Sequence, residues 1–72
     1  MTALRRPLDL HTRLGVFRRD GYRCQHCGVS GTVFTLEADH VVPQSWGGSD
    51  HPDNLQTLCR PCNRSKGDLF VG

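Results

Sequence analysis

Two short motifs, Cys24-Gln25-His26-Cys27 and Cys59-Arg60-Pro61-Cys62, decide how this chain folds. Four thiolates satisfy a tetrahedral zinc ion completely and leave no open position on it for chemistry. In a chain of 72 residues a hydrophobic core alone leaves the stability marginal, so a staple such as a structural metal ion or disulfide bonds is expected. We therefore predict a structural zinc site formed by Cys24, Cys27, Cys59 and Cys62. Because zinc binding contributes on the order of 10 kcal/mol, the metal-free chain should be largely unfolded.

Two disulfide bonds are the alternative use of four cysteines, and the cellular compartment decides between the two. The N-terminus starts with basic residues but continues with Asp9, His11 and Arg13, where a signal peptide needs an apolar stretch. We expect the chain to remain intracellular, in the cytoplasm, where a metal site is favoured. No apolar run approaches the length of a spanning helix, so no membrane partner is expected.

The charge of the chain is a weak argument for nucleic acid, because the net charge is only +2. The type of cation says more: eight of the nine Lys and Arg residues are Arg, whose planar fork suits phosphate. They fall near the N-terminus, between residues 13 and 23, and between residues 60 and 66. A solvated helix face balanced by seven acidic residues is the alternative explanation.

The first half of the chain predicts one helix and one zinc-binding turn. Leucine and phenylalanine recur at helical spacing from Leu10 to Asp20, with Asp9 as a cap and Gly21 as a stop. Residues 1–8 are expected to be a flexible basic arm and residues 9–72 a single domain. In the first cysteine motif, Gly28 would relieve the turn, and His26 should face solvent because four sulfurs already fill the site.

The second half predicts two strands and a helix. Strand-forming residues run from Val33 to Ala38 and resume at Val41-Val42 until Pro43, with Asp39-His40 near the end of this strand. Residues 44–53 have loop composition, and we favour Trp46 as a cover for the core over a stacking platform. Residues 54–58 suit a helical turn or a returning strand, and the strand is preferred. Pro61 could begin a helix that ends at Gly67 or Asp68.

The residues between the cysteine motifs offer hydrolytic chemistry. Asp39 is a hard oxygen donor, Asn63 offers an amide oxygen, and His40 is largely neutral at pH 7. Such a site leaves positions on Mg²⁺ or Mn²⁺ for water and substrate, and the imidazole can take a proton from water, which suits phosphodiester hydrolysis. Neighbouring strand residues point to opposite faces, so Asp39 and His40 share a site only if the strand twists, bulges or ends there. An Asp-His pair is common, and Asn63 could serve only as a helix-start residue, so the residues alone leave this interpretation open.

The stretch Leu36-Glu37-Ala38-Asp39-His40-Val41-Val42-Pro43, followed by Gly47-Gly48 and by Asp53-Asn54-Leu55-Gln56-Thr57-Leu58-Cys59-Arg60-Pro61-Cys62-Asn63-Arg64-Ser65-Lys66-Gly67, resembles the HNH endonucleases of the four-cysteine kind. The resemblance covers about residues 18–68. It implies a small α+β fold of the ββα-metal (His-Me finger) type, in which two antiparallel strands and a helix hold one divalent ion. The cysteine zinc would hold the ends of the hairpin together, and the predicted N-terminal helix is an addition to this unit.

The resemblance also implies a role for each matching residue. His40 corresponds to the general base, Asp39 to a ligand of the catalytic ion, and Asn54 to a residue that constrains the loop and orients the histidine. The third position of the motif, usually histidine, is Asn63 here, which the family also uses as a metal ligand. An amide oxygen favours hard ions, so the expected catalytic cofactor is Mg²⁺ or Mn²⁺. Arg64 and Lys66 are candidates for phosphate contacts, with a solvated helix face as the alternative.

The function implied is a one-metal DNA endonuclease that contacts the phosphate backbone and leaves a 5′-phosphate and a 3′-hydroxyl. The resemblance further suggests a part in a larger nuclease or in phage DNA packaging, and a bacterial or phage-infected host cell. The alternative is a non-catalytic, zinc-stapled module that binds DNA or another protein. The joint presence of Asp39, His40, Asn54 and Asn63 favours the enzyme.

Overall fold

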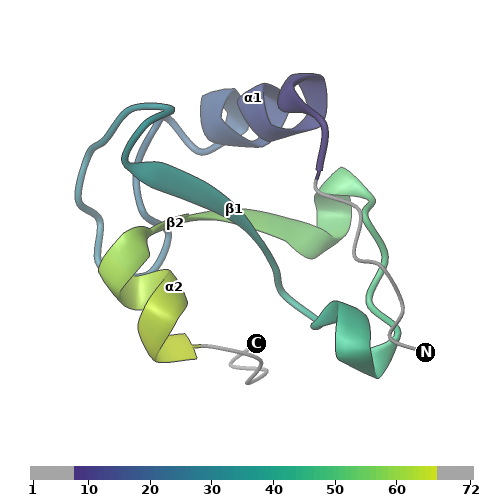
Figure 1. Cartoon of the computed structure of the whole chain (residues 1–72). Helices are drawn as coiled ribbons and strands as arrows, with labels where there is room; N and C mark the ends of the chain where they lie inside the picture. The colour runs from purple at the N-terminus through teal and green to yellow at the C-terminus, as the bar shows by residue number, and fades with distance from the viewer. Residues whose placement is uncertain (1–7, 67–72) are drawn as a thin grey trace.

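The computed structural model describes residues 8–66 and shows a small α+β unit of two helices and one β-hairpin. Residues 1–7 of the expected basic arm and the predicted end of the second helix lie outside this range. The elements in chain order are α1 (Leu10–Arg19), β1 (Leu36–His40), the 3₁₀ turns η1 (Gln44–Trp46) and η2 (Pro52–Asn54), β2 (Leu55–Cys59) and α2 (Arg60–Lys66) (Figure 1). The predicted order of one helix, two strands and a helix is confirmed.

The N-terminal helix begins and ends as its sequence signals indicate. The carboxylate of Asp9 accepts a hydrogen bond from the Thr12 N–H at 2.7 Å and so satisfies a free donor of the first turn. After the C-cap, Gly21 takes a positive φ of 68°, a conformation that costs glycine little. Val16 and Phe17 are buried, which sets the face that α1 turns toward the hairpin.

The hairpin pairs β1 with β2 in an antiparallel register that runs from Leu36 opposite Cys59 to His40 opposite Leu55. The preference for a strand over a helical turn at residues 55–58 is therefore confirmed. The prediction that β1 begins at Val33 was wrong. Thr32 and Thr35 form a turn in which the Thr32 N–H donates to Thr35 Oγ1 at 2.9 Å, and such local side-chain bonds compete with strand pairing.

The strand also ends earlier than its apolar run. Val41 N–H donates to the Asn54 carbonyl at 2.8 Å, and Val42 N–H donates to the Asn54 side chain at 2.9 Å. The Asn54 N–H donates to the His51 carbonyl at 2.8 Å and not back to β1, so the strand pairing stops after His40. Asp39 and His40 therefore lie at the end of β1, as the sequence indicated.

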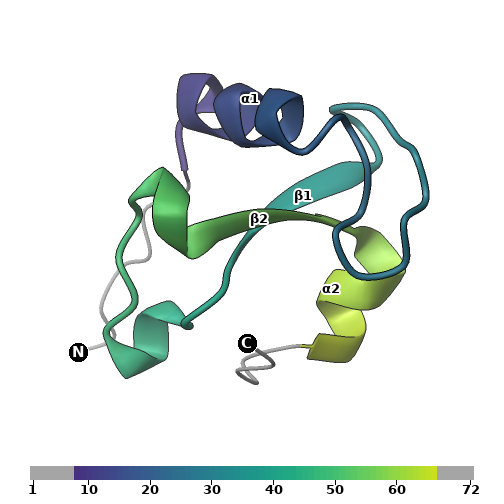
Figure 2. The same cartoon turned by 180° about the vertical axis from the view of Figure 1, so that it is seen from behind.

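The two helices lie on opposite sides of the hairpin, as the two views show (Figures 1 and 2). Side chains directly opposite in an antiparallel pair share a face. The face toward α1 carries Leu36, Leu55 and Thr57, whose hydroxyl donates to the Val16 carbonyl at 3.4 Å. The other face carries Glu37, Asp39 and Leu58 and lies toward α2. The buried apolar residues among those described are Val16, Phe17, Cys24, Leu36, Leu55 and Leu58.

A buried carboxylate joins α1 to β2. Asp20 accepts hydrogen bonds from Arg19 Nε and from the Thr57 N–H, both at 2.9 Å. Burial raises the pKa of Asp20, but the bonds from Arg19 and Thr57 outweigh it and hold the pKa below its usual value. Arg19 also donates to the carbonyls of Pro52 and Leu55. Arg19, one of the arginines between residues 13 and 23, therefore stabilises the fold by bonding Asp20 and the η2–β2 backbone.

Trp46 is 62% exposed at the end of η1, so the expectation that it covers the core was wrong. The neighbouring Pro43 is buried instead. Within residues 8–66, no helix has the length and apolar character needed to cross a membrane.

Candidate metal centres and nuclease site

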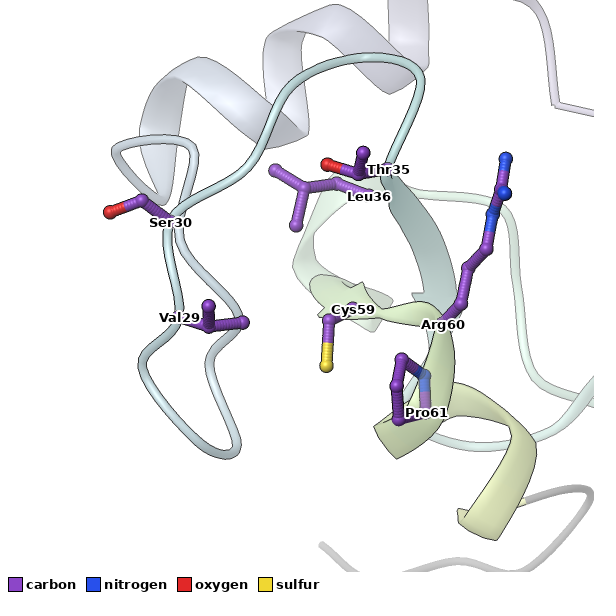
Figure 3. Close-up of a pocket in the computed structure, with 7 residues that line it drawn as sticks. All are labelled: Val29, Ser30, Thr35, Leu36, Cys59, Arg60 and Pro61. Atoms are coloured by element: carbon purple, nitrogen blue, oxygen red, sulfur yellow. The ribbon is translucent and has the colours of Figure 1, made fainter.

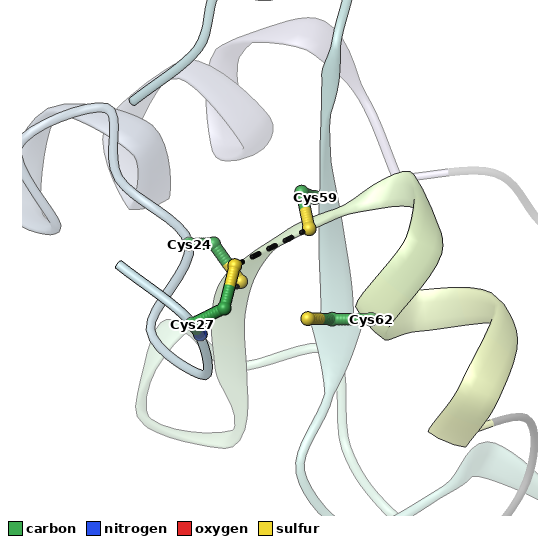
Figure 4. Close-up of side chains that lie close together, drawn as sticks. All are labelled: Cys24, Cys27, Cys59 and Cys62. Atoms are coloured by element: carbon green, nitrogen blue, oxygen red, sulfur yellow. Dashed lines mark hydrogen bonds between the residues drawn. The ribbon is translucent and has the colours of Figure 1, made fainter. Parts of the chain in front are cut away.

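The four cysteine sulfurs converge on one point, where they lie within 4.8 Å of one another (Figure 4). Cys24 and Cys27 come from the loop after α1, Cys59 ends β2, and Cys62 lies in the first turn of α2. The sulfurs of Cys27 and Cys59, one from each motif, are 3.7 Å apart. The four cysteines are thus positioned to bind one metal ion, as the spacing predicted.

Backbone geometry prepares the first motif for a metal. Gly28 takes a φ of 84°, and its N–H donates to the Cys24 carbonyl at 2.9 Å, which closes the predicted turn. Burial opposes ionisation of Cys24, but bonds from backbone N–H groups outweigh it and lower its pKa to about 6. The Cys59 thiol raises the pKa of Cys62 to about 12, because neighbouring thiolates repel. A bound cation would remove this conflict. His26 is exposed, as expected.

A second polar centre lies between β1 and α2. The Lys66 ammonium is 2.9 Å from Asp39 Oδ2 and donates to the His40 carbonyl at 2.9 Å. Asp39 Oδ2 is buried and accepts no hydrogen bond of good geometry. Its partner is the positive charge of the Lys66 ammonium. Lys66 is only 6% exposed. Both sequence interpretations of Lys66, a phosphate contact and a solvated face, assumed an accessible ammonium, and the structure places it otherwise.

Asn63 lies one helical turn before Lys66 and so on the same face of α2. Its Nδ2 donates to Glu37 Oε1 on β1, and Arg60 Nε lies 3.6 Å from Glu37 Oε2. Sequence reasoning gave Glu37 no role. A signal was available, because strand residues two positions apart share a face and Glu37 must therefore lie beside Asp39.

His40 turns its ring toward the loop that follows β1. His40 Nε2 lies 2.7 Å from Asp50 Oδ1, and Gln44 Nε2 donates to the same oxygen at 3.0 Å. The contacts with His40 and Gln44 lower the pKa of Asp50. Nδ1 is the ring nitrogen left to accept a proton. Asp50 was not predicted, since its approach depends on the path of a loop that spacing does not define.

Asn54 holds both ends of that loop. Its amide exchanges hydrogen bonds with Val42 N–H at 2.9 Å and Val42 carbonyl at 3.1 Å, and it donates to the Ser49 carbonyl at 2.8 Å. Gly48 lies so close that an added Cβ would be 1.8 Å from the Val42 carbonyl oxygen. The loop therefore has one tightly defined path between β1 and β2.

An apolar pocket of about 390 Å³ lies on another part of the molecule (Figure 3). It opens between the first cysteine loop and the junction of β2 with α2. Its lining residues are Val29, Ser30, Thr35, Leu36, Cys59, Arg60 and Pro61. Asp39, His40, Asn54 and Asn63 are absent from its walls, so the pocket is separate from the polar centre.

The structure thus brings some of the expected site residues together and separates others. Asp39 and Asn63 lie on facing surfaces of β1 and α2, whereas the His40 ring contacts Asp50 and Arg64 is exposed. The buried oxygen of Asp39 fits a hard divalent cation. The Asn63 amide fits as well, because its nitrogen is engaged by Glu37 and its oxygen remains available as a ligand.

Comparison with known proteins finds relatives that are similar to this chain in sequence. Relatives include the CRISPR-associated endonuclease Cas9 of Actinomyces naeslundii, 40% identical over 75% of this chain and 5% of that protein. A probable HNH endonuclease of Lactococcus phage SK1 is 39% identical over 71% of this chain and 60% of that protein. The type IV methyl-directed restriction enzyme EcoKMcrA of Escherichia coli is 38% identical over 57% of this chain and 17% of that enzyme.

A solved structure shares the fold. The type II-C Cas9 enzyme from Actinomyces naeslundii superimposes with a TM-score of 0.70 at 36% identity, over 79% of this chain and 6% of that one. The chain therefore spans a small part of the length of the Cas9 relatives. The model of the HNH endonuclease family matches residues 24–69, a range that begins at the first cysteine and includes β1, β2 and α2. This chain belongs to the HNH endonuclease family.

Proposed function

We propose that this chain is a metal-dependent endonuclease that hydrolyses phosphodiester bonds in DNA. One observation carries the proposal: the family match spans the β1-β2-α2 unit in which a buried carboxylate oxygen of Asp39 faces the side of α2 that carries Asn63. The relatives named as endonucleases support the same activity.

The two metals have separate tasks in this proposal. Zinc is the ion we assign to the four cysteines, since a set of four sulfurs fills its tetrahedral shell and leaves no position for substrate. Mg²⁺ or Mn²⁺ is the ion we assign to Asp39 and Asn63, whose hard oxygen donors suit either. When bound there, the divalent ion supplies charge neutralisation for the phosphate and for the departing 3′-oxygen.

His40 is the residue we assign as general base. With Nε2 held by Asp50, Nδ1 can take the proton of a water that attacks phosphorus, and the Asp50 carboxylate stabilises the imidazolium that forms. Asn54 preserves this arrangement because it fixes the loop from which Asp50 comes. The products would be a 5′-phosphate and a 3′-hydroxyl.

The two cations on α2, Arg64 and Lys66, differ in their access to a DNA phosphate. Arg64 is exposed and is the residue that we assign to a phosphate contact. Lys66 would reach a phosphate only after leaving Asp39, because its ammonium is buried against that carboxylate.

We also infer that the domain acts within a larger nuclease or within phage DNA packaging. Support comes from the Cas9 relatives, of which this chain spans 5%, and from the phage relative. The test is the cleavage rate with and without a candidate partner protein, and strong stimulation is expected. A rate unchanged by every candidate partner would contradict this inference.

The activity is tested by nicking of supercoiled plasmid with zinc-loaded protein in Mg²⁺ or Mn²⁺. His40→Ala should lose cleavage while its zinc content and melting temperature match those of the wild type. His11→Ala is the matched control, since it removes an exposed imidazole on α1 to which no role is assigned.

Two outcomes would contradict the proposal. Cleavage that survives His40→Ala in pure protein would remove His40 from the mechanism. DNA binding without cleavage in any divalent metal would instead support the non-catalytic, zinc-stapled binding module.

A further inference from the structure

We propose that Glu37 is a positioning residue for the catalytic metal site, because its carboxylate turns the Asn63 amide so that the oxygen faces the divalent ion. The inference rests on the proposed function, which makes Asn63 a metal ligand. It assigns a task to a residue outside the metal-ligand set and the general base.

The chemistry of the contact fixes the orientation of the amide. An ionised carboxylate only accepts hydrogen bonds, so the Asn63 group that faces Glu37 Oε1 must be the NH₂. The amide oxygen is then directed away from Glu37. Without this partner, the two orientations of the amide would be separated by little energy before the ion binds, and one of them would present NH₂ to the incoming ion.

The position of Glu37 suits this task. Glu37 and Asp39 alternate on the face of β1 that lies toward α2, where Asn63 and Lys66 are one turn apart. Each strand carboxylate thus has a helix partner: Lys66 for Asp39 and Asn63 for Glu37.

Arg60 holds the Glu37 carboxylate in place. Its Nε is 3.6 Å from Glu37 Oε2, and its Nη2 donates to the Phe34 carbonyl at 2.7 Å. The Glu37 side chain is 39% exposed, so it can be replaced without opening the hydrophobic core. This exposure makes a clean experiment feasible.

The first experiment measures Mn²⁺ binding to zinc-loaded protein by titration calorimetry and by the electron paramagnetic resonance signal of free Mn²⁺. Glu37→Met removes the acceptor and should weaken binding about 10- to 100-fold, the usual effect of losing a group that orients a ligand. Glu37→Gln should lose clearly less, because its amide oxygen can accept the same N–H. Asp53→Asn is the control for the loss of one negative charge, since the Asp53 side chain is 93% exposed.

Two results would overturn the inference. Equal Mn²⁺ affinity in Glu37→Met and wild type would show that Asn63 needs no orientation. Equal losses in Glu37→Gln and Glu37→Met would show that Glu37 acts through its charge or as a ligand itself.

A second experiment tests the pair directly. Asn63→Asp places a carboxylate against Glu37, so two like charges meet where the amide N–H had donated a hydrogen bond. Adding Glu37→Gln supplies a donor for the new carboxylate, so the double variant should bind Mn²⁺ more tightly than Asn63→Asp alone. No recovery would contradict the positioning role.

The outcomes separate this inference from the proposed function. A wild-type protein that neither binds Mn²⁺ nor cleaves DNA would overturn both. A wild type that does both, with Glu37→Met binding Mn²⁺ as tightly, would overturn only the role of Glu37. Unchanged zinc content and melting temperature in each variant confirm that the fold is intact.

Discussion

At the scale of single residues, Lys66 and Asp39 form the most consequential pair. The Lys66 ammonium and the Oδ2 atom of Asp39 are buried, and burying opposite charges is costly unless each neutralises the other. The pair explains how the chain tolerates a carboxylate at this depth when no divalent ion is bound. It also means that an ion binding to Asp39 competes with a charge that the chain itself supplies.

We predict that Lys66→Met destabilises the zinc-loaded protein by about 3 kcal/mol in buffer free of Mg²⁺ and Mn²⁺, because Asp39 is left as an uncompensated buried charge. Saturating Mn²⁺ should recover much of this loss by taking the place of the ammonium. The measurement is urea unfolding with and without Mn²⁺. Arg64→Met, which removes an exposed cation from the same helix, should change stability little. A loss of equal size in Mn²⁺ would count against the competition.

The proposed site residues can be read from the sequence to different degrees. Asp39, His40, Asn54 and Asn63 were proposed because they stand at fixed positions in a motif. The contact of Lys66 with Asp39 could not be predicted, because it depends on how far α2 is rotated against β1, and sequence spacing does not give that rotation. The Asp50 contact depends in the same way on the path of a loop.

At the scale of elements, the loop between β1 and β2 is held by side-chain hydrogen bonds and by a close backbone approach. Asn54 binds Val42 and Ser49, and the backbone at Gly48 passes against the Val42 carbonyl. Asp50, the partner of His40, comes from the same loop. The loop therefore positions His40, the proposed base, and a change in the path of the loop should move Asp50 relative to the His40 ring.

We predict opposite effects for two glycine-to-alanine substitutions. Gly48→Ala forces a Cβ to 1.8 Å from the Val42 oxygen, so the loop must shift, and we expect a loss of about 1–3 kcal/mol and slower DNA cleavage. Gly15→Ala has open space within α1 and should stabilise the protein by about 0.5–1 kcal/mol without changing cleavage. Urea unfolding and plasmid nicking measure both. A Gly48→Ala variant as stable and active as wild type would contradict the tight loop.

Element boundaries show where pattern reasoning stops. The helix from Leu10 was predictable because its cap, its apolar spacing and its terminal glycine agree. The start of β1 was not predictable in this way. The Thr32–Thr35 turn overrides the strand propensity of Val33 and Phe34, and it leaves Phe34 78% exposed. A local hydrogen bond here outweighs the residue pattern.

At the scale of the whole molecule, the sulfur cluster joins segments that are far apart in the sequence. The described apolar core consists of six residues, one of which is Cys24 itself. The cluster ties the loop after α1 to the end of β2 and the start of α2. Cys62 directly precedes Asn63, so the proposed structural ion should also fix a ligand of the proposed catalytic one.

Zinc removal should therefore act on the entire fold, whereas removal of the divalent ion should act on the site alone. A strong zinc chelator is expected to abolish the cooperative unfolding transition, since structural zinc contributes on the order of 10 kcal/mol, comparable with the stability of a whole domain. Zn²⁺ should restore the transition, and Mg²⁺ or Mn²⁺ should not. Thermal unfolding followed by circular dichroism is the measurement.

The same distinction applies to variants, and it separates the two ways of losing activity. Cys27→Ser should lose both zinc and cleavage because the fold is lost, while His40→Ala should lose cleavage and still melt like the wild type. Zinc content, melting curve and plasmid nicking are compared for both variants. If the chelated chain or Cys27→Ser kept a cooperative transition at the wild-type temperature, the four cysteines would not be the staple of the fold. The proposed catalytic groups would then owe their positions to the hairpin and its two helices alone.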